Sequence, residues 1–310
     1  MYKTDAHSCE WRFLEGGPFI HYYTLPIHDD LLFRNEEELD IAMNFIAVAT
    51  LWTGVSLLAF AIMNNHLHFV LEASLERCHA FYATFQKRLK AYYIRHGRKT
   101  SLVTKAQSGW TIINNLSHLR NELAYVIRNP FVDRTSVNLF AYKWCSGYLY
   151  FNDLLPLIDS LGKPAAEMSA RECRHFNRSR SQDVDSRIRV LDEAALPSSF
   201  VDYQRAMSFF ESARQFVLWT LRNVEPQIAI ARRMGDNVVL DDTELWSIVR
   251  KVCKDKFDVT GPKQLPNDDR IRLAQTLKYD YGASNAQIAR TTGILRQSVD
   301  ELFPMSASKK

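Results

Sequence analysis

Cysteine, glycine and proline are all scarce in this sequence, which has 5 Cys, 11 Gly and 10 Pro among 310 residues. The cysteines form no Cys-x-x-Cys pair, and an odd, dispersed set argues against a disulfide framework and a cysteine-built zinc site. A reducing cytoplasm fits this usage best. Because 46% of the residues are hydrophobic, the chain has enough apolar surface to fold, and extensive disorder is not expected.

A strong net charge is absent as well, since 39 Lys and Arg residues against 35 Asp and Glu residues leave a formal charge of +4. This balance is too mild to indicate a nucleic-acid partner, so local clusters of basic residues must decide that question. The first residues, MYKTDAHSCEW, contain an acid and a histidine where a signal peptide has an apolar core, and secretion is therefore not expected.

Only one segment, residues 45–63, resembles a membrane span, because it carries no charged side chain over a length close to what a bilayer requires. Thr50, Thr53 and Gly54 interrupt this segment, and polar, histidine-rich residues follow it. We therefore expect the end of a helix, a turn at Thr53-Gly54 and then a buried strand, rather than a membrane span.

The first half of the chain predicts a sheet with helices. Asn35 offers an N-cap, and Glu38 three positions later completes a capping box. Asn64-Asn65 suits a tight hairpin, and Pro130 is expected to stop the helix before it. The expected strands cover 19–33 (with a polar break at 28–30), 55–63 and 66–73, and the expected helices cover 36–49, 81–93 and 117–129. This order predicts an α+β fold, a ferredoxin-like antiparallel sheet with helices on one face.

Beyond residue 152 the pattern becomes helical, and we expect three domains: 1–151, a helical domain over 152–262 and a tail over 263–310. The segment 171–189 holds six arginines and no clear period, which predicts a loop or hinge. The remaining expected elements are helices over 199–235 and 242–257, with one weak strand pattern at 237–240.

The tail has the pattern of a helix-turn-helix. Ser284 and Gln287 form a capping box, Gly293 suits the turn, and a second helix is expected over 296–303, after an earlier one over 269–281. In such a motif the start of the second helix enters the major groove of DNA. The residues expected to contact DNA there are Arg296, Gln297 and Ser298. A helical hairpin that only packs or binds protein has the same pattern.

His66-Leu67-His68 lies in a predicted strand, where side chains alternate between faces, so both imidazoles project to one side. Two imidazoles at this spacing can bind one metal ion. Surface or structural histidines would also give this short pattern, so it is a weak signal alone.

Tyr125 and Asn129 are four residues apart on the predicted helix and therefore share one face. This arrangement would suit a site in which the Asn129 amide oxygen completes a metal site. The Tyr125 phenol, one helical turn away, would then attack a phosphate bound to that metal. A tyrosine in an apolar helix is also commonly a core residue, and this alternative stays open.

The segments MNNHLHFVL and AYVIRNPFV together resemble the histidine-hydrophobe-histidine strand and the nucleophile helix of HUH single-tyrosine transposases, in their REP-associated branch. The resemblance covers residues 19 to about 151. It implies an HUH endonuclease domain that cleaves and rejoins single-stranded or hairpin DNA, including elements like repetitive extragenic palindromes. Tyr125 would form a 5′-phosphotyrosine intermediate, and the protein would be nucleoid-associated in the cytoplasm and able to form a homodimer.

The resemblance also implies a divalent ion held by His66, His68 and Asn129. Imidazole ligands ordinarily favour zinc or another transition metal, whereas the family uses Mg²⁺ or Mn²⁺. We follow the family and expect Mg²⁺ or Mn²⁺, with no nucleotide cofactor, because attack by a phenol conserves the phosphoester bond.

A basic, aromatic segment over 87–99 is the expected grip on DNA, since cations neutralise phosphates and exposed rings stack on unpaired bases. The candidate DNA-binding residues here are Lys87, Arg88, Lys90, Tyr92, Tyr93, Arg95, Arg98 and Lys99, and Arg120 and Arg128 flank the expected nucleophile. A solvated helix face would give a similar pattern.

Two other functions remain open from the sequence. One is a non-catalytic, sequence-specific DNA-binding regulator that uses the C-terminal helix-turn-helix. The other is a zinc hydrolase of small substrates, which would need neither the basic segment nor the tail.

Overall fold

The computed structural model describes residues 6–27, 30–133, 140–222, 230, 240 and 242–304. The chain divides into two compact units, Met1–Asp236 and Asn237–Lys310, and each is described here by itself. The boundaries predicted after residues 151 and 262 do not coincide with this division.

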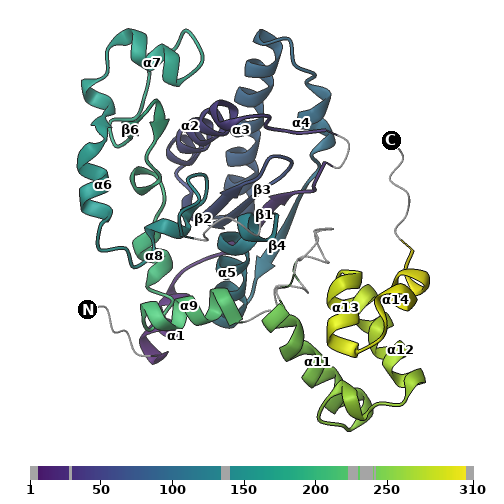
Figure 1. Ribbon diagram of the computed structural model, residues 1–310. Coiled ribbons are helices and arrows are strands. Elements are labelled where there is room, and N and C mark those ends of the chain that lie inside the picture. Colours follow the sequence, from purple (N-terminus) through teal and green to yellow (C-terminus); the bar gives the residue numbers. More distant parts are fainter. Residues whose placement is uncertain are drawn as a thin grey trace. The chain divides into compact units, whose positions relative to one another are not determined.

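A four-stranded antiparallel sheet forms the centre of the first unit (Figure 1). Its strands are β1 (Phe19–Thr24), β2 (Ser56–Ile62), β3 (Leu67–Glu72) and β4 (Ser108–Ile113), in the order β2-β3-β1-β4. Because β3 lies between β1 and β2, the connectivity is the split β-α-β arrangement of the ferredoxin-like fold. The predicted α+β class with an antiparallel sheet is confirmed. The edge strand β4 was not predicted.

The connections between strands are helical: α2 (Glu36–Thr53) joins β1 to β2, and α3 (Leu75–Arg95) and α4 (Ser101–Lys105) join β3 to β4. Asn35 caps α2 as predicted, because its side chain accepts a hydrogen bond from the Glu38 amide at 2.9 Å. Gly54 ends the helix with a φ of 64°, where glycine is favoured. The expected helix, turn and buried strand across 45–63 are therefore confirmed.

Helix α5 (Leu116–Asp133) runs through Pro130, so the prediction that this proline stops the helix is wrong. The missing amide hydrogen removes one bond, to the carbonyl of Val126, and only the last residues of the helix follow. The loss of that single bond does not terminate the final turn.

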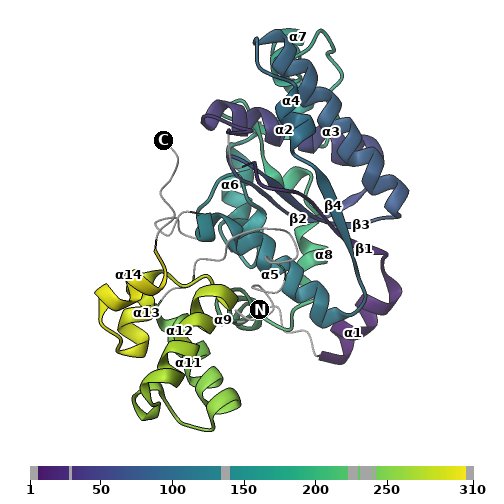
Figure 2. The same cartoon turned by 90° about the vertical axis from the view of Figure 1, so that its right-hand side faces the viewer.

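Helices cover both faces of the sheet, which corrects the expectation of helices on one face. Along β3, Phe69 packs against Phe81 of α3 with ring centroids 5.1 Å apart. His68, on the opposite face, lies 5.4 Å from the ring of Tyr125 in α5. Figures 1 and 2 show α2 and α3 on one side of the strands and α5 on the other. The two-sided cover brings α5 to the histidines.

The rest of the first unit packs on this sheet. The Asp202 amide donates to the carbonyl of Leu57 at 2.8 Å, and Arg205 pairs with Glu72 at 2.9 Å, so residues 152–222 share the compact unit of the sheet. The region after residue 152 was expected to be all-helical, but it contains a small sheet, β5-β6-β7, and helix α7 lies within the expected loop 171–189. The further elements are α1 (Ala6–Glu15), η1 (Ser146–Leu149), α6 (Leu155–Leu161), β5 (Lys163–Pro164), η2 (Ala165–Glu167), α7 (Ala170–Phe176), β6 (Arg189–Leu191), β7 (Ala194–Ala195), η3 (Pro197–Ser199), α8 (Tyr203–Met207) and α9 (Ala213–Arg222).

The second unit is helical in its described part, which confirms the predicted helical C-terminal region. Its elements are α11 (Asp242–Phe257), η4 (Pro262–Gln264), α12 (Asn267–Gln275), the π-helical turn η5 (Thr276–Asp280), α13 (Asn285–Thr292) and α14 (Arg296–Leu302). The capping box of Ser284 and Gln287 is confirmed, and Gly293 ends α13 with a φ of 74°. Recognition of DNA by this hairpin stays a prediction. Residues 237–239 of the weak strand pattern lie outside the described residues, as do residues 223–235 of the expected helix, apart from Ile230.

Among the helices that the structure describes, we find no segment with the length and apolar character needed to cross a bilayer.

Candidate functional site

The turn between β2 and β3 is held by its two asparagine side chains. Asn64 Nδ2 donates to the carbonyl of Phe33 at 2.9 Å, and Asn65 Nδ2 donates to the carbonyl of Ile27 at 3.3 Å. His66 directly follows this turn, and His68 is the second residue of β3. Both are buried, and their ring centroids are 4.9 Å apart. The two imidazoles project to one face of the sheet, as expected.

Asn129 of α5 reaches both imidazoles. Its Oδ1 lies 3.1 Å from His66 Nε2, and its Nδ2 lies 3.1 Å from His68 Nε2. One turn earlier, the ring of Tyr125 stands at 89° to the ring of His68. The four residues that the sequence singled out, from segments about sixty residues apart, therefore lie in one cluster. Their chemical roles stay predictions.

The hydrogen bonds around His66 determine which of its ring nitrogens carries the proton. Because Asn65 Nδ2 donates to the Ile27 carbonyl, Asn65 Oδ1 faces His66 Nδ1, at 2.7 Å. We therefore assign the proton to Nδ1, which leaves a lone pair on His66 Nε2. This lone pair points at Asn129 Oδ1, which is also an acceptor.

Two acceptors 3.1 Å apart repel each other unless a cation or a proton lies between them. Ligands about 2.0–2.2 Å from one ion, and at right angles to each other, are about 2.8–3.1 Å apart. The spacing of His66 Nε2 and the Asn129 amide oxygen fits two ligands of one divalent ion, and His68 Nε2 lies 3.1 Å from the nitrogen of the same amide. Across the described ranges, no group of three or more His, Cys, Asp or Glu side chains could hold a metal, so an ion here would use the amide.

Three further residues of the cluster were missed by the sequence analysis. His21 of β1 contacts Glu122 of α5, with 2.6 Å between Nδ1 and Oε2, and His68, with 3.1 Å between Nε2 and Nδ1. His118 contacts the other oxygen of Glu122 at 2.9 Å. The spacing of His118 and Glu122, four apart on a predicted helix, was a detectable signal. The position of His21 depends on the pairing of β1 with β3, which no local pattern reveals.

The basic segment 87–99 differs from the expected DNA grip. Tyr92 and Tyr93 are buried, and the Tyr93 hydroxyl donates to the Leu32 carbonyl, so neither ring is available to stack on a base. Burial also raises the pKa of both phenols. Arg98 lies over the Tyr93 ring, 4.3 Å from its centroid, and pairs with Glu38. These residues stabilise the contact between α3 and α2.

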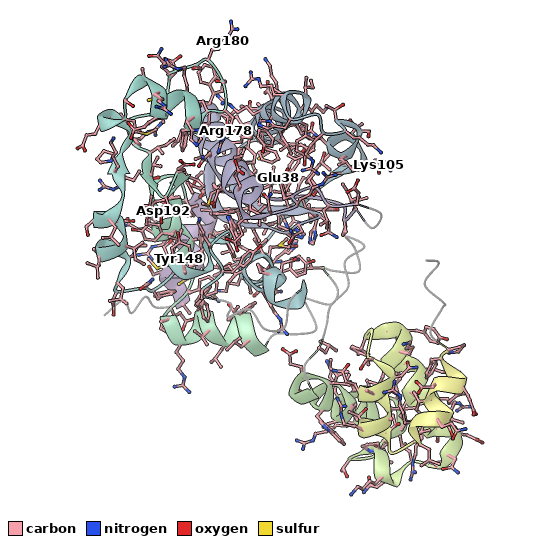
Figure 3. All side chains as sticks on the ribbon, turned by 45° about the horizontal axis from the view of Figure 1, so that its top comes forward. Glu38, Lys105, Tyr148, Arg178, Arg180 and Asp192 are labelled. Atoms are coloured by element: carbon pink, nitrogen blue, oxygen red, sulfur yellow. The ribbon has the colours of Figure 1, made fainter. Side chains whose placement is uncertain are left out.

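The loop after α7 covers another part of this segment. Arg88 donates to Asn177 Oδ1 at 3.4 Å, and Arg95 donates to the carbonyl of Arg178. Figure 3 labels Arg178 and also Glu38. Desolvation lowers the pKa of Arg88. The basic residues of the segment that remain exposed are Lys87, Arg95 and Lys99, and Lys90 is partly exposed.

The other candidate contacts to DNA lie in two places. Arg120 and Arg128 are buried in α5, so neither is exposed to DNA in this conformation, and Arg120 Nε donates to the carbonyl of Phe209 at 2.7 Å. In the second unit, Arg296 and Gln297 are exposed on α14 and Ser298 is partly exposed, which suits contact with a partner. Arg296 also pairs with Asp300 at 2.8 Å.

Comparison with known proteins adds little to this geometry. No family model matches the chain. No curated protein matches it either. Among solved structures, one described as a REP-associated tyrosine transposase bound to a REP hairpin is similar, with 12% identity over 43% of this chain and 78% of that chain and a TM-score of 0.33. The likeness is distant, so the functional argument depends on the residues of the cluster.

Proposed function

We propose that this protein is a metal-dependent transposase that cleaves and rejoins single-stranded or hairpin DNA through a 5′-phosphotyrosine intermediate on Tyr125. The supporting observation is that the Nε2 atoms of His66 and His68 converge on the Asn129 amide beside the Tyr125 ring. The resemblance of the two motifs to HUH single-tyrosine transposases supports the same reaction.

The reaction balances without a nucleotide cofactor. The Tyr125 oxygen forms a bond to phosphorus and loses its proton, while the bond from phosphorus to the 3′-oxygen breaks and that oxygen takes up a proton. One phosphoester replaces another, so the 3′-hydroxyl of a second strand can reverse the step. The chain's own part is to orient the phenol and to exclude competing water.

His66, His68 and Asn129 would hold a divalent ion, Mg²⁺ or Mn²⁺. When bound, such an ion polarises the phosphate and stabilises the charge that develops on its oxygens. Asn129 and Tyr125 share one face of α5, so the helix fixes the phenol relative to these ligands.

The cluster is closed in this conformation, since Tyr125 is 3% exposed and His68 is 0% exposed. A phosphodiester can reach the phenol only after the protein over the site opens. The proposal therefore includes an opening step before cleavage, of the kind that gates many enzymes.

The test uses hairpin oligonucleotides with randomised single-stranded flanks, incubated with the full chain and Mn²⁺. A 3′ label should remain with the protein on a denaturing gel, because the tyrosine holds the 5′ end of the released segment, whereas a 5′ label should be released. We expect no adduct with Tyr125→Phe and strongly reduced adduct with His66→Ala. Tyr279→Phe, an exposed tyrosine of the second unit, is the matched control and should form the adduct normally.

Other outcomes distinguish the alternatives. An adduct that persists in Tyr125→Phe would mean that another tyrosine is the nucleophile. Binding of duplex DNA with no adduct in any variant would favour the non-catalytic regulator, with the C-terminal helical hairpin as its DNA-binding element.

A further inference from the structure

A continuous row of polar side chains, buried except at its outer end, leads from α5 to the histidine pair. It runs from His118 through Glu122 and His21 to His68, with contacts of 2.9, 2.6 and 3.1 Å. Glu122, His21 and His68 are each 0% exposed, whereas the His118 side chain is 24% exposed. Burying a carboxylate is costly unless its oxygens accept hydrogen bonds. Both Glu122 oxygens contact imidazoles, yet neither contact is to a residue that the proposed reaction uses.

The order of donors and acceptors along this row can be assigned from Glu122. A carboxylate only accepts, so the short contact to His21 places a proton on His21 Nδ1. The Nε2 of a neutral His21 is then an acceptor, and His68 must donate to it from Nδ1. The remaining nitrogen of His68, Nε2, keeps its lone pair and faces Asn129.

His68 and His66 thus present lone pairs to the same amide. Asn129 has one donor end and one acceptor end, so it can donate to only one of these two Nε2 atoms. A divalent ion would satisfy both nitrogens together with the amide oxygen. The opposite proton order along the row would place hydrogen on His68 Nε2 and exclude an ion from that nitrogen.

We propose that Glu122 and His21 are positioning residues that hold His68 in the tautomer that binds a divalent cation. This inference rests on the proposed function for the use of the ion, but the proton order can be measured without DNA or metal. Carboxylates that contact a metal-bound histidine without binding the metal themselves commonly fix the tautomer and the ring orientation of that histidine.

The first measurement is nitrogen NMR of the metal-free, full-length protein with ¹⁵N-labelled histidines, assigned by His21→Gln, His66→Gln and His68→Gln. We expect protonated Nδ1 and unprotonated Nε2 in His66, His68 and neutral His21. A proton on His68 Nε2 would overturn the inference, and the proton positions are read from the wild-type protein, the variants serving only to assign its signals.

The second measurement is calorimetric titration with Mn²⁺ alone. Glu122→Gln keeps the size of the side chain but adds a donor, and it should weaken Mn²⁺ binding by about 10–100-fold. Glu76→Gln, an exposed glutamate of α3, is the control and should bind as the wild type does. Equal affinities of Glu122→Gln and wild type would overturn the inference.

The two proposals can fail separately. Expected tautomers and Mn²⁺ binding without any DNA adduct would remove the transposase function and leave the role of Glu122 and His21. A Tyr125 adduct in a protein whose His68 carries its proton on Nε2 would support the transposase function and remove the proposed role of Glu122 and His21.

Discussion

Asn129 is the residue on which the chemistry of the cluster converges. It is the shared neighbour of both imidazole Nε2 atoms and lies one helical turn from Tyr125. An amide is neutral, so in the metal-free protein it adds no charge to a buried site where an unpaired charge would be costly. The same oxygen is available to a cation. One side chain therefore suits both the empty and the loaded state of the proposed site.

Substitution of Asn129 separates its role as a ligand from its role in packing. Asn129→Leu should weaken Mn²⁺ binding by at least about tenfold, because it removes the oxygen ligand, whereas Asn129→Asp should bind Mn²⁺ at least as tightly as the wild type, because it supplies a charged oxygen. Calorimetric titration with Mn²⁺ checks both. Unchanged affinity in Asn129→Leu would show that the amide is not a ligand.

Helix α5 places three chemical groups on one face. Glu122, Tyr125 and Asn129 follow at intervals of three and four residues, which match the helical period. Pro130 comes directly after Asn129 and removes only one hydrogen bond, so the helix still presents its final turn to the sheet. The local pattern therefore determines the spacing of these groups, and the packing of α5 on the sheet determines what they meet.

In the second unit, α14 is joined to α13 through Asp300. Its carboxylate accepts hydrogen bonds from Arg296 Nε at 2.8 Å and from Asn285 Nδ2 at 2.9 Å. The hydrogen bond from Arg296, followed by the one from Asn285, lowers the pKa of Asp300. A carboxyl whose pKa is lower in the folded state stabilises that state above its unfolded pKa, and the contribution is lost as the pH falls through the folded pKa.

We therefore expect amide exchange in α13 and α14 of the full chain to accelerate as the pH is lowered below about 4, after correction for intrinsic exchange. Asp300→Asn should lack this increase, because it has no carboxyl to protonate. An equal increase in Asp300→Asn would assign the acid sensitivity to other groups.

At the scale of the whole molecule, the chain divides its features between two units. The first contains the histidine, asparagine and tyrosine cluster, and the second exposes Arg296 and Gln297 at the start of α14. This division would suit a protein in which one unit is catalytic and the other binds the duplex DNA that flanks the cleavage site. The division also means that a defect in the second unit need not alter the cluster.

Arg296→Ala should lower affinity for a hairpin with its preferred duplex flank by roughly tenfold, the usual magnitude for loss of one base contact, while adduct yield at saturating DNA stays unchanged. Binding at constant salt and adduct yield measure the two effects. Glu301→Ala, on the same helix, removes a negative charge and should not weaken binding. Equal affinities of Arg296→Ala and wild type would argue against DNA reading by α14.

The sequence by itself determined the features that are local along the chain. The cap at Asn35, the turn at Gly54, the hairpin at Asn64-Asn65 and the helical spacing of Tyr125 and Asn129 all follow from neighbouring residues, and the structure contains each of them. These features depend on backbone preferences and on periods of two or four residues, which a sequence displays directly.

Only the tertiary structure decided which distant side chains meet. The pairing of β1 with β3 brings His21 to His68, and the packing of α5 on the second face of the sheet brings Glu122 to His21. Burial of Tyr93 between α3 and the segment before α2 likewise removed a ring expected at the surface. The physical reason is that strand register and burial depend on contacts across the whole fold, which local patterns do not encode.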